Sequence, residues 1–285
     1  MAKETMKAVV FHGKLDVRVE DRPVPKIVDQ TDIIIKVRYS ALCGSELHVF
    51  RGHQPSKTGF IMGHETTGEI VELGSEVKNH KKGDRVVMPF TASCGECFYC
   101  IRGYSSRCEK CVLFGCPLLD GGQAEYMRVP LADSTAVKAP EGIEEKKLVL
   151  MADIFPTGYF AAKNAFEGFS ANGRGADCVI EGVGHADALR TGFDLLRPFG
   201  NISSFGVHQD EIPWTGTEGY GKNLKIQMGR CPVRSVFPHA LEVLKKNQHK
   251  LDFMTDKIMP MSQAIEGYDI FNKMQVHKVI FEPEH

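Results

Sequence analysis

Short apolar runs alternate with glycine and proline turns over the first 140 residues. β-branched and aromatic residues dominate these runs, which is typical of strands. The pattern predicts strands at residues 7–11, 32–39, 68–74 and 84–88. Pro23 and Pro25 break the pattern between the first two. We expect residues 1 to about 140 to form a compact β barrel with long loops.

The pattern changes near residue 143, where apolar residues begin to recur at helical spacing. Helices are predicted at residues 148–169, 185–196, 238–246 and 262–274, and strands at residues 177–181, 201–206 and 278–281. Strands that alternate with helices favour a parallel α/β layer. The predicted fold class is therefore α/β, with a β-rich first part.

The charges of the chain are nearly balanced, with 35 Lys and Arg against 36 Asp and Glu. This balance argues against a mainly electrostatic grip on nucleic acid or on an anionic membrane. No apolar run approaches the roughly 20 residues that a membrane-spanning helix needs. The N-terminus has no apolar signal core, so a cytoplasmic location is expected.

Four of the nine cysteines fall within one short segment, as Cys94-x2-Cys97-x2-Cys100-x7-Cys108. Four closely spaced thiolates on a turning backbone supply the tetrahedral ligand set of a closed, structural zinc site. An iron–sulfur cluster would more typically have a shorter third spacing and a proline after the last cysteine. Unbound thiols are the remaining alternative. Cys111 lies three residues after Cys108 and is an alternative fourth ligand.

Three separate segments carry a second set of ligand types, at residues 43–48, 63–68 and 152–158. Each segment alone is ordinary, because a lone cysteine, histidine or aspartate more often packs, hydrogen-bonds or caps a helix. Their order, with the four-cysteine loop between the second and third, is specific. Together with residues 63–86 and the segment Asp120-Gly121-Gly122, it resembles the zinc-dependent medium-chain alcohol dehydrogenases. Asp153 before Pro-Thr-Gly-Tyr looks most like the glutathione-independent formaldehyde dehydrogenase branch.

The resemblance implies a GroES-like β-barrel catalytic domain and a Rossmann-type domain. The first would span residues 1–150, with residues 265–285 returning to it, and the second would span residues 151–264. It implies two zinc ions per chain. Cys43, His64 and Asp153 would hold the catalytic zinc and leave a fourth position open.

The resemblance also implies roles for three more residues of these segments. Glu65 would be a neighbouring or transient ligand. Ser45 and His48 match the family's proton relay, which carries the alcohol proton to solvent. Zinc polarises the substrate oxygen while a hydride passes to the nicotinamide. The implied function is therefore hydride transfer between a small alcohol or aldehyde and NAD or NADP.

The expected Rossmann-type domain, residues 151–264, lacks the G-x-G-x-x-G turn that normally binds the cofactor's phosphates. The nearest match begins at Gly182 and Gly184, but Asp187 stands in place of the third glycine. Thr157, Gly182 and Gly184 are the candidate cofactor residues. By the same resemblance, we expect the chain to pass from the helix that ends near residue 170 directly to the family's fourth strand. About sixty residues, two units of about thirty, are therefore expected to be absent, so the Rossmann domain is predicted to be incomplete.

Two functions follow from this reading. The first is a zinc-dependent NAD(P) oxidoreductase, which we expect to form a homodimer or homotetramer. The alternative is a catalytically impaired, truncated zinc protein that acts as a structural or partner-binding protein. A nucleic-acid-binding zinc ribbon fits poorly, because few basic residues surround the cysteine loop.

Overall fold

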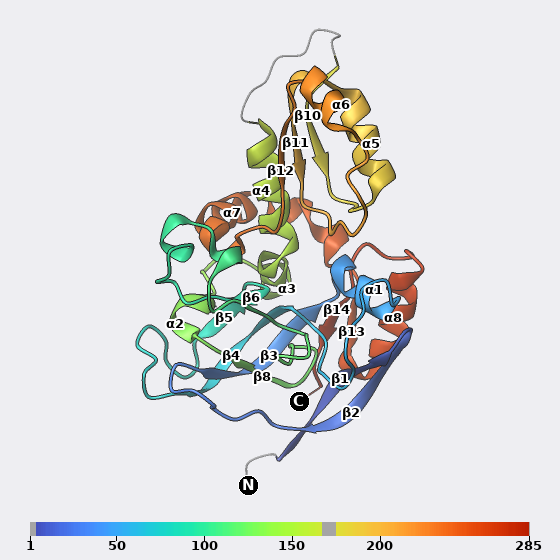
Figure 1. The fold of residues 1–285 in the computed structure, drawn as a ribbon. Helices are drawn as coiled ribbons and strands as arrows, with labels where there is room; N and C mark the ends of the chain where they lie inside the picture. Colours follow the sequence, from blue (N-terminus) through green and yellow to red (C-terminus); the bar gives the residue numbers. More distant parts are fainter. Residues whose placement is uncertain (1–3, 167–174, 285) are drawn as a thin grey trace. The chain divides into compact units, whose positions relative to one another are not determined.

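Three consecutive isoleucines open strand β3 (Ile33–Ala41) in the computed structural model, whose fold is drawn in Figure 1. The structure describes residues 4–166 and 175–284. Ile33, Ile34 and Ile35 are all buried, so both faces of β3 are covered. β3 pairs with three antiparallel neighbours, and it is therefore the hub of the largest sheet.

The described residues divide into two compact units, Met1–Phe155 with Pro232–His285, and Pro156–Cys231. The large sheet of the first unit has the strand order β13-β14-β3-β4-β5-β9, with β8 also paired to β3. Its other strands are β4 (Glu65–Leu73), β5 (Arg85–Met88), β8 (Tyr126–Val129), β9 (Val137–Lys138), β13 (Ile258–Pro260) and β14 (Ile280–Glu282). The prediction of a β-rich first part is confirmed.

Two small sheets complete the strands of the first unit. They pair β1 (Thr5–Gly13) with β2 (Asp16–Pro23), and β6 (Thr91–Ala92) with β7 (Val112–Leu113). The helices of this unit are α1 (Gly44–Phe50), α2 (Ala132–Thr135), α3 (Glu145–Leu148), α7 (Val233–Asn247) and α8 (Ala264–Asn272). One buried cluster joins β1, α1, α8 and β14 through Val9, Leu47, Tyr268 and Phe281.

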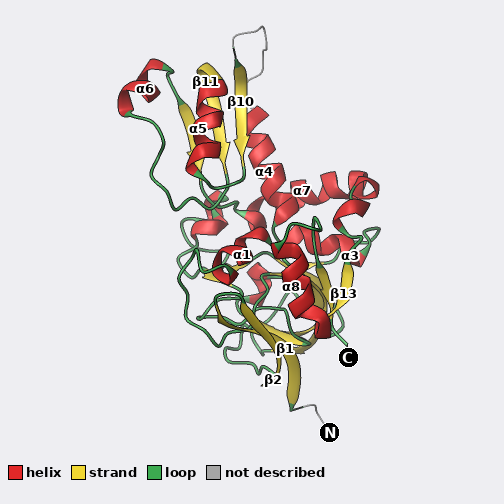
Figure 2. Cartoon of the chain, turned by 90° about the vertical axis from the view of Figure 1, so that its right-hand side faces the viewer, coloured by secondary structure: helices red, strands yellow, loops and turns green. Residues whose placement is uncertain are grey.

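The second unit holds a three-stranded parallel sheet in the order β10-β11-β12. Its elements are α4 (Ile154–Phe166, which begins two residues before the unit), β10 (Ala176–Glu181), α5 (Ala186–Leu195), β11 (Leu196–Ser204), α6 (Gly216–Gly221) and β12 (Lys225–Met228). Helix α5 packs on β10 and β11 (Figure 2). The predicted parallel α/β layer is thus confirmed. The expected junction near residue 170 lies outside the described residues.

The helix predicted at residues 148–169 is interrupted at Asp153. A 3-10 turn covers Val149–Ala152, and α4 then begins at Ile154. Asp153 itself has non-helical backbone angles, with φ −148° and ψ −71°. Pro156 explains the break, because inside a continuous helix its ring would clash with the carbonyl of Ala152. In the first turn of a new helix the same proline is tolerated.

No helix in the described part of the chain is long and apolar enough to cross a bilayer.

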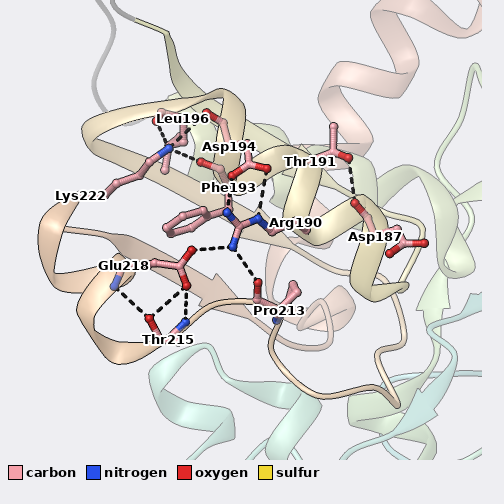
Figure 3. A network of polar contacts seen from close by, with 10 residues as sticks. All are labelled: Asp187, Arg190, Thr191, Phe193, Asp194, Leu196, Pro213, Thr215, Glu218 and Lys222. Atoms are coloured by element: carbon pink, nitrogen blue, oxygen red, sulfur yellow. Dashed lines mark hydrogen bonds and ion pairs between the residues drawn. The ribbon is translucent and has the colours of Figure 1, made fainter.

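A network of polar contacts joins helices α5 and α6 of the second unit (Figure 3). Arg190 on α5 contacts Glu218 on α6 at 2.7 Å and also pairs with Asp194. Lys222 follows α6, and its Nζ donates to the carbonyls of Phe193, Asp194 and Leu196 at the end of α5. A cation at this end satisfies carbonyls that lack helical partners and complements the helix dipole.

We expect Lys222→Met to destabilise the second unit by about 1–2 kcal/mol, because several carbonyl acceptors lose a charged donor. Amide hydrogen exchange in α5 and α6 measures this change. The matched control is Lys225→Met, since Lys225 is an exposed lysine on β12. Equal exchange rates in the two variants would contradict the capping role of Lys222.

Candidate metal centres and active site

The loop after β6 brings four sulfur atoms together. The Sγ atoms of Cys94, Cys97, Cys100 and Cys108 all lie within 4.8 Å of one another. The structure places Cys108, and not Cys111, in this group. Backbone N–H groups of Cys94 and Lys110 donate to the Cys108 sulfur at 3.2 and 3.3 Å. Such donors stabilise a thiolate.

The pKa values of two cysteines in this loop are shifted in opposite directions. A hydrogen bond from the backbone of Glu109 lowers the pKa of Cys97 to about 6. Burial raises the pKa of Cys100 to about 12. Four neighbouring thiols resist joint ionisation because their negative charges repel, and a bound divalent cation removes that penalty. The arrangement suits a closed tetrahedral metal site.

A second group joins Cys43, His64, Glu65 and Asp153, whose ligand atoms also lie within 4.8 Å of one another. Cys43 is the N-cap of α1, and Glu65 opens β4 directly opposite Ala41 of β3. The end of β3 and the start of β4 therefore meet at the group. Asp153 enters from the break before α4, and its Oδ2 lies 3.4 Å from His64 Nε2.

Gly63 sets the backbone just before His64. It has a φ of +103°, and an added Cβ would lie 2.6 Å from the backbone nitrogen of Gln123. Gly122 is equally crowded, since its Cβ would lie 2.1 Å from Thr66 Oγ1. These close approaches explain the glycines on both sides of this contact. They allow residues 120–123 to pack against the segment that carries His64, just before β4.

His64 directs its two ring nitrogens to different partners. Nε2 faces Asp153 and lies 3.4 Å from Ser45 Oγ, whereas Nδ1 lies 3.7 Å from Glu46 Oε1. The other oxygen of Glu46 accepts the backbone N–H of Cys43 at 2.9 Å. Glu46 therefore orients both a thiol and an imidazole. A carboxylate behind a histidine typically fixes the ring of a metal ligand.

Sequence reasoning missed Glu46 and the residues that hold it. Gln123 Nε2 donates to Glu46 Oε1 at 3.4 Å, and Tyr268 Oη donates to Gln123 at 3.0 Å. All three side chains are buried. One local signal could have found Glu46, because it stands three residues after Cys43 in a capping-box position. Gln123 and Tyr268 have no comparable signal, since their partners are distant in sequence.

Lys278 is the other residue that the sequence did not reveal. Its Nζ lies 2.6 Å from Glu65 Oε2, and both side chains are almost fully buried. Glu65 Oε1 is buried without a hydrogen-bond partner among the described residues. An orphaned carboxylate oxygen beside a thiol, an imidazole and a second carboxylate fits a cation such as zinc.

Burial dominates the electrostatics of this second group. It raises the pKa of Cys43, and the charges of Glu65 and Asp153 raise it further. It also raises the pKa of Glu65 to about 7 against the opposing effect of Lys278. Burial would lower the pKa of His64, but Glu46 and Asp153 outweigh it and hold that pKa well above the usual value. A cation here would stabilise the thiolate and both carboxylates.

The two expected relay residues lie on α1. Ser45 Oγ donates to Cys43 Sγ at 3.2 Å, so it belongs to the same group of contacts. His48 lies three residues further, on the same face of the helix, and its ring is 6.3 Å from that of His53. Burial and the neighbouring His53 and Arg51 lower the pKa of His48. A neutral imidazole near physiological pH can accept a proton.

The candidate cofactor residues lie in the second unit, with Thr157 in the first turns of α4. Gly182 and Gly184 follow β10, and Gly184 has a φ of +77°. The backbone N–H groups of Val183 and Gly184 both donate to Glu181 Oε1 at 2.7 Å. A carboxylate of the chain itself therefore takes the donors that a phosphate would use in such a turn.

Comparisons with known proteins define the class first. Residues 29–141 match the family model described as "Alcohol dehydrogenase GroES-like domain". An alcohol dehydrogenase from Thermus sp. ATN1 shares the fold, with a TM-score of 0.88 at 24% identity, covering 98% of this chain and 100% of that one. The chain thus has an alcohol dehydrogenase fold.

One curated relative then defines the family, and a second is similar over part of its length. Zinc-type alcohol dehydrogenase B of Aspergillus flavus is 56% identical over 347 positions, covering 97% of this chain and 81% of the relative. Glutathione-independent formaldehyde dehydrogenase of Pseudomonas aeruginosa is 36% identical over 197 residues, covering 62% of this chain and 48% of that protein. The chain belongs to the zinc-type alcohol dehydrogenase family and is an oxidoreductase.

The alignment with the Aspergillus relative is longer than this chain. It spans 347 positions, more than the 285 residues of this chain. Part of the relative therefore has no counterpart here.

We expect Cys108→Ser to lower the zinc content by one ion per chain, because the tetrahedral set loses a thiolate. Cys111→Ser is the matched control and should keep the full zinc content, since Cys111 lies outside the four-sulfur group. Native mass spectrometry of both variants gives the count. Zinc loss in the Cys111 variant alone would reverse the assignment.

Proposed function

We propose that the chain is a zinc-dependent oxidoreductase that transfers a hydride between a small alcohol or aldehyde and NAD or NADP. The observation that carries this proposal is the group of Cys43, His64, Glu65 and Asp153, in which a buried carboxylate oxygen of Glu65 has no hydrogen-bond partner among the described residues. Membership of the zinc-type alcohol dehydrogenase family supports it.

The roles of the two metal groups differ in this proposal. Cys94, Cys97, Cys100 and Cys108 would hold a structural zinc with no open position. Cys43, His64 and Asp153 would hold a second zinc and leave one position for substrate. When bound, that zinc supplies Lewis-acid polarisation of the substrate oxygen. One thiolate and one carboxylate balance its charge, and neutral His64 adds none.

The protein's own side chains would transfer the alcohol proton and would hold the metal-binding residues in position. Ser45 would accept the hydroxyl proton of the alcohol, since its Oγ already lies within 3.4 Å of His64 Nε2 and 3.2 Å of Cys43 Sγ. His48 would pass that proton toward solvent from the same face of α1. Glu46, held by Gln123, would keep His64 and Cys43 in place.

The second unit would be the remaining part of the nucleotide-binding domain, with Thr157, Gly182 and Gly184 as its candidate contacts. The parallel order β10-β11-β12 supports this assignment. We also expect a homodimer or homotetramer, as the family resemblance implies.

One observation favours a second candidate function, a catalytically impaired zinc protein with a structural or partner-binding role. In the described residues the second unit has a sheet of three strands, and Glu181 already takes the amides of Val183 and Gly184. Both features leave the unit with fewer strands and fewer free backbone donors for binding a dinucleotide.

The deciding experiment is turnover by the purified, zinc-loaded chain. Short alcohols are offered with NAD or with NADP, and the reduced nicotinamide is followed by its absorbance, beside a calorimetric titration of each cofactor. Zinc-dependent formation of reduced nicotinamide is the expected result. Two bound zinc ions with no cofactor binding and no turnover would establish the impaired form instead.

We expect Ser45→Ala to reduce kcat by at least about 100-fold, because the alcohol proton loses its acceptor. The zinc content should stay unchanged, since Ser45 is not a proposed ligand. The matched control is Ser56→Ala, since Ser56 is exposed and bonds only its neighbour's carbonyl in the contacts described. Unchanged kcat in Ser45→Ala would remove Ser45 from the relay.

A further inference from the structure

A lysine is buried beside the proposed catalytic metal group. The side chain of Lys278 is 1% exposed and that of its partner Glu65 is 0% exposed, with 2.6 Å between Nζ and Oε2. The register of the large sheet creates this contact. Ala41 of β3 pairs with Glu65 of β4 on one side and with Ile280 of β14 on the other. Lys278 precedes Ile280 by two residues and so reaches the same end of β3.

A buried ion pair of this kind contributes little net stability to the folded state. Desolvation of two buried charges costs several kcal/mol, and apolar side chains of similar size would often serve the fold equally well. Glu65 also belongs to the group formed with Cys43, His64 and Asp153. Its two oxygens differ, because Oε2 forms the ion pair with Lys278, while Oε1 has neither an ion pair nor a hydrogen bond among the described contacts.

The charges of the group explain why a lysine is needed. The Cys43 thiolate and the Asp153 carboxylate together balance one divalent cation. Glu65, which is fully buried, then adds a third negative charge. Lys278 supplies the matching positive charge, so the charges of Cys43, Asp153, Glu65, Lys278 and a divalent metal sum to zero, while the Glu46 carboxylate lies behind His64. Without Lys278, the metal would be the nearest remaining cation for the Glu65 carboxylate.

We propose that Lys278 is a positioning residue that holds Glu65 beside the catalytic metal and keeps its carboxylate out of the metal's open position. The proposal rests on the proposed function, because it requires a metal at the Cys43 group. Lys278 touches neither substrate nor reacting atoms in this role. It acts through Glu65, and its removal should convert Glu65 into a metal ligand.

The test uses the full chain with cobalt(II) in place of zinc. Imidazole is added as a neutral ligand, and the visible absorption bands of cobalt report its binding. A closed four-thiolate site has no position for imidazole, so the change reports the open site. In Lys278→Met we expect a changed cobalt spectrum and imidazole binding weakened by at least about 10-fold. In Lys278→Arg, which keeps the charge, we expect wild-type behaviour.

Two further variants separate positioning from simple damage to the fold. Lys278→Met combined with Glu65→Gln should recover imidazole binding, because the competing carboxylate is gone. Lys147→Met is the matched control, since Lys147 is a second buried lysine of this unit, paired instead with Glu144 and Asp252. It should leave the cobalt spectrum unchanged. If Lys278→Met does not fold, Lys278→Gln carries the same comparison with a neutral hydrogen-bond donor.

Each outcome bears on the proposal. A cobalt spectrum and an imidazole affinity that Lys278→Met or Lys278→Gln leaves at wild-type values would overturn the role of Lys278 while the metal site stands. Failure of the double variant to recover imidazole binding would also overturn it. A wild-type chain that binds no cobalt at the Cys43 group would overturn both this role and the proposed function.

Discussion

The burial of several ionisable groups at one point is the constraint on which the structure depends. Cys43, His64, Glu65 and Asp153 meet where water is largely excluded, and charged groups are costly there unless they are paired. β3 is central to this because its end brings Cys43, Glu65 and Lys278 together through two strand pairings. The first unit thereby brings these ionisable side chains to one place, where a bound cation would balance their charge. Glu46 and Gln123 extend this organisation from the ligands into the core.

Much of the site could be predicted from the sequence, because its ligands occur in short segments with distinctive spacing. The four-cysteine loop is local, and the structure gathers the same four sulfurs that its spacing singles out. The supporting residues could not be found in this way. Lys278 and Tyr268 contact partners far away in the sequence, and only the register of the sheet and the packing of α8 bring them close. The break at Asp153 was also missed, because the apolar pattern of the segment continues through it.

In the second unit, polar contacts within the chain hold a small α/β sheet and its helices together. Its described sheet has three parallel strands, fewer than the dinucleotide-binding fold normally uses. Lys222 and Arg190 tie α5 to α6, and Glu181 satisfies the turn after β10 from within the chain. The parallel layer could be predicted because strand and helix patterns are local in the sequence, and the structure confirms it.

The central claim is that the buried Cys43 group holds a metal with an open position, separate from the four-sulfur site. Crystals of the purified chain, measured at the zinc absorption edge, test this most directly. The account predicts two anomalous peaks per chain, one among Cys94, Cys97, Cys100 and Cys108, and one among Cys43, His64 and Asp153 with Glu65 turned to Lys278. A single peak at the four-cysteine loop, or a second zinc ligated by Glu65 in place of an open position, would contradict it.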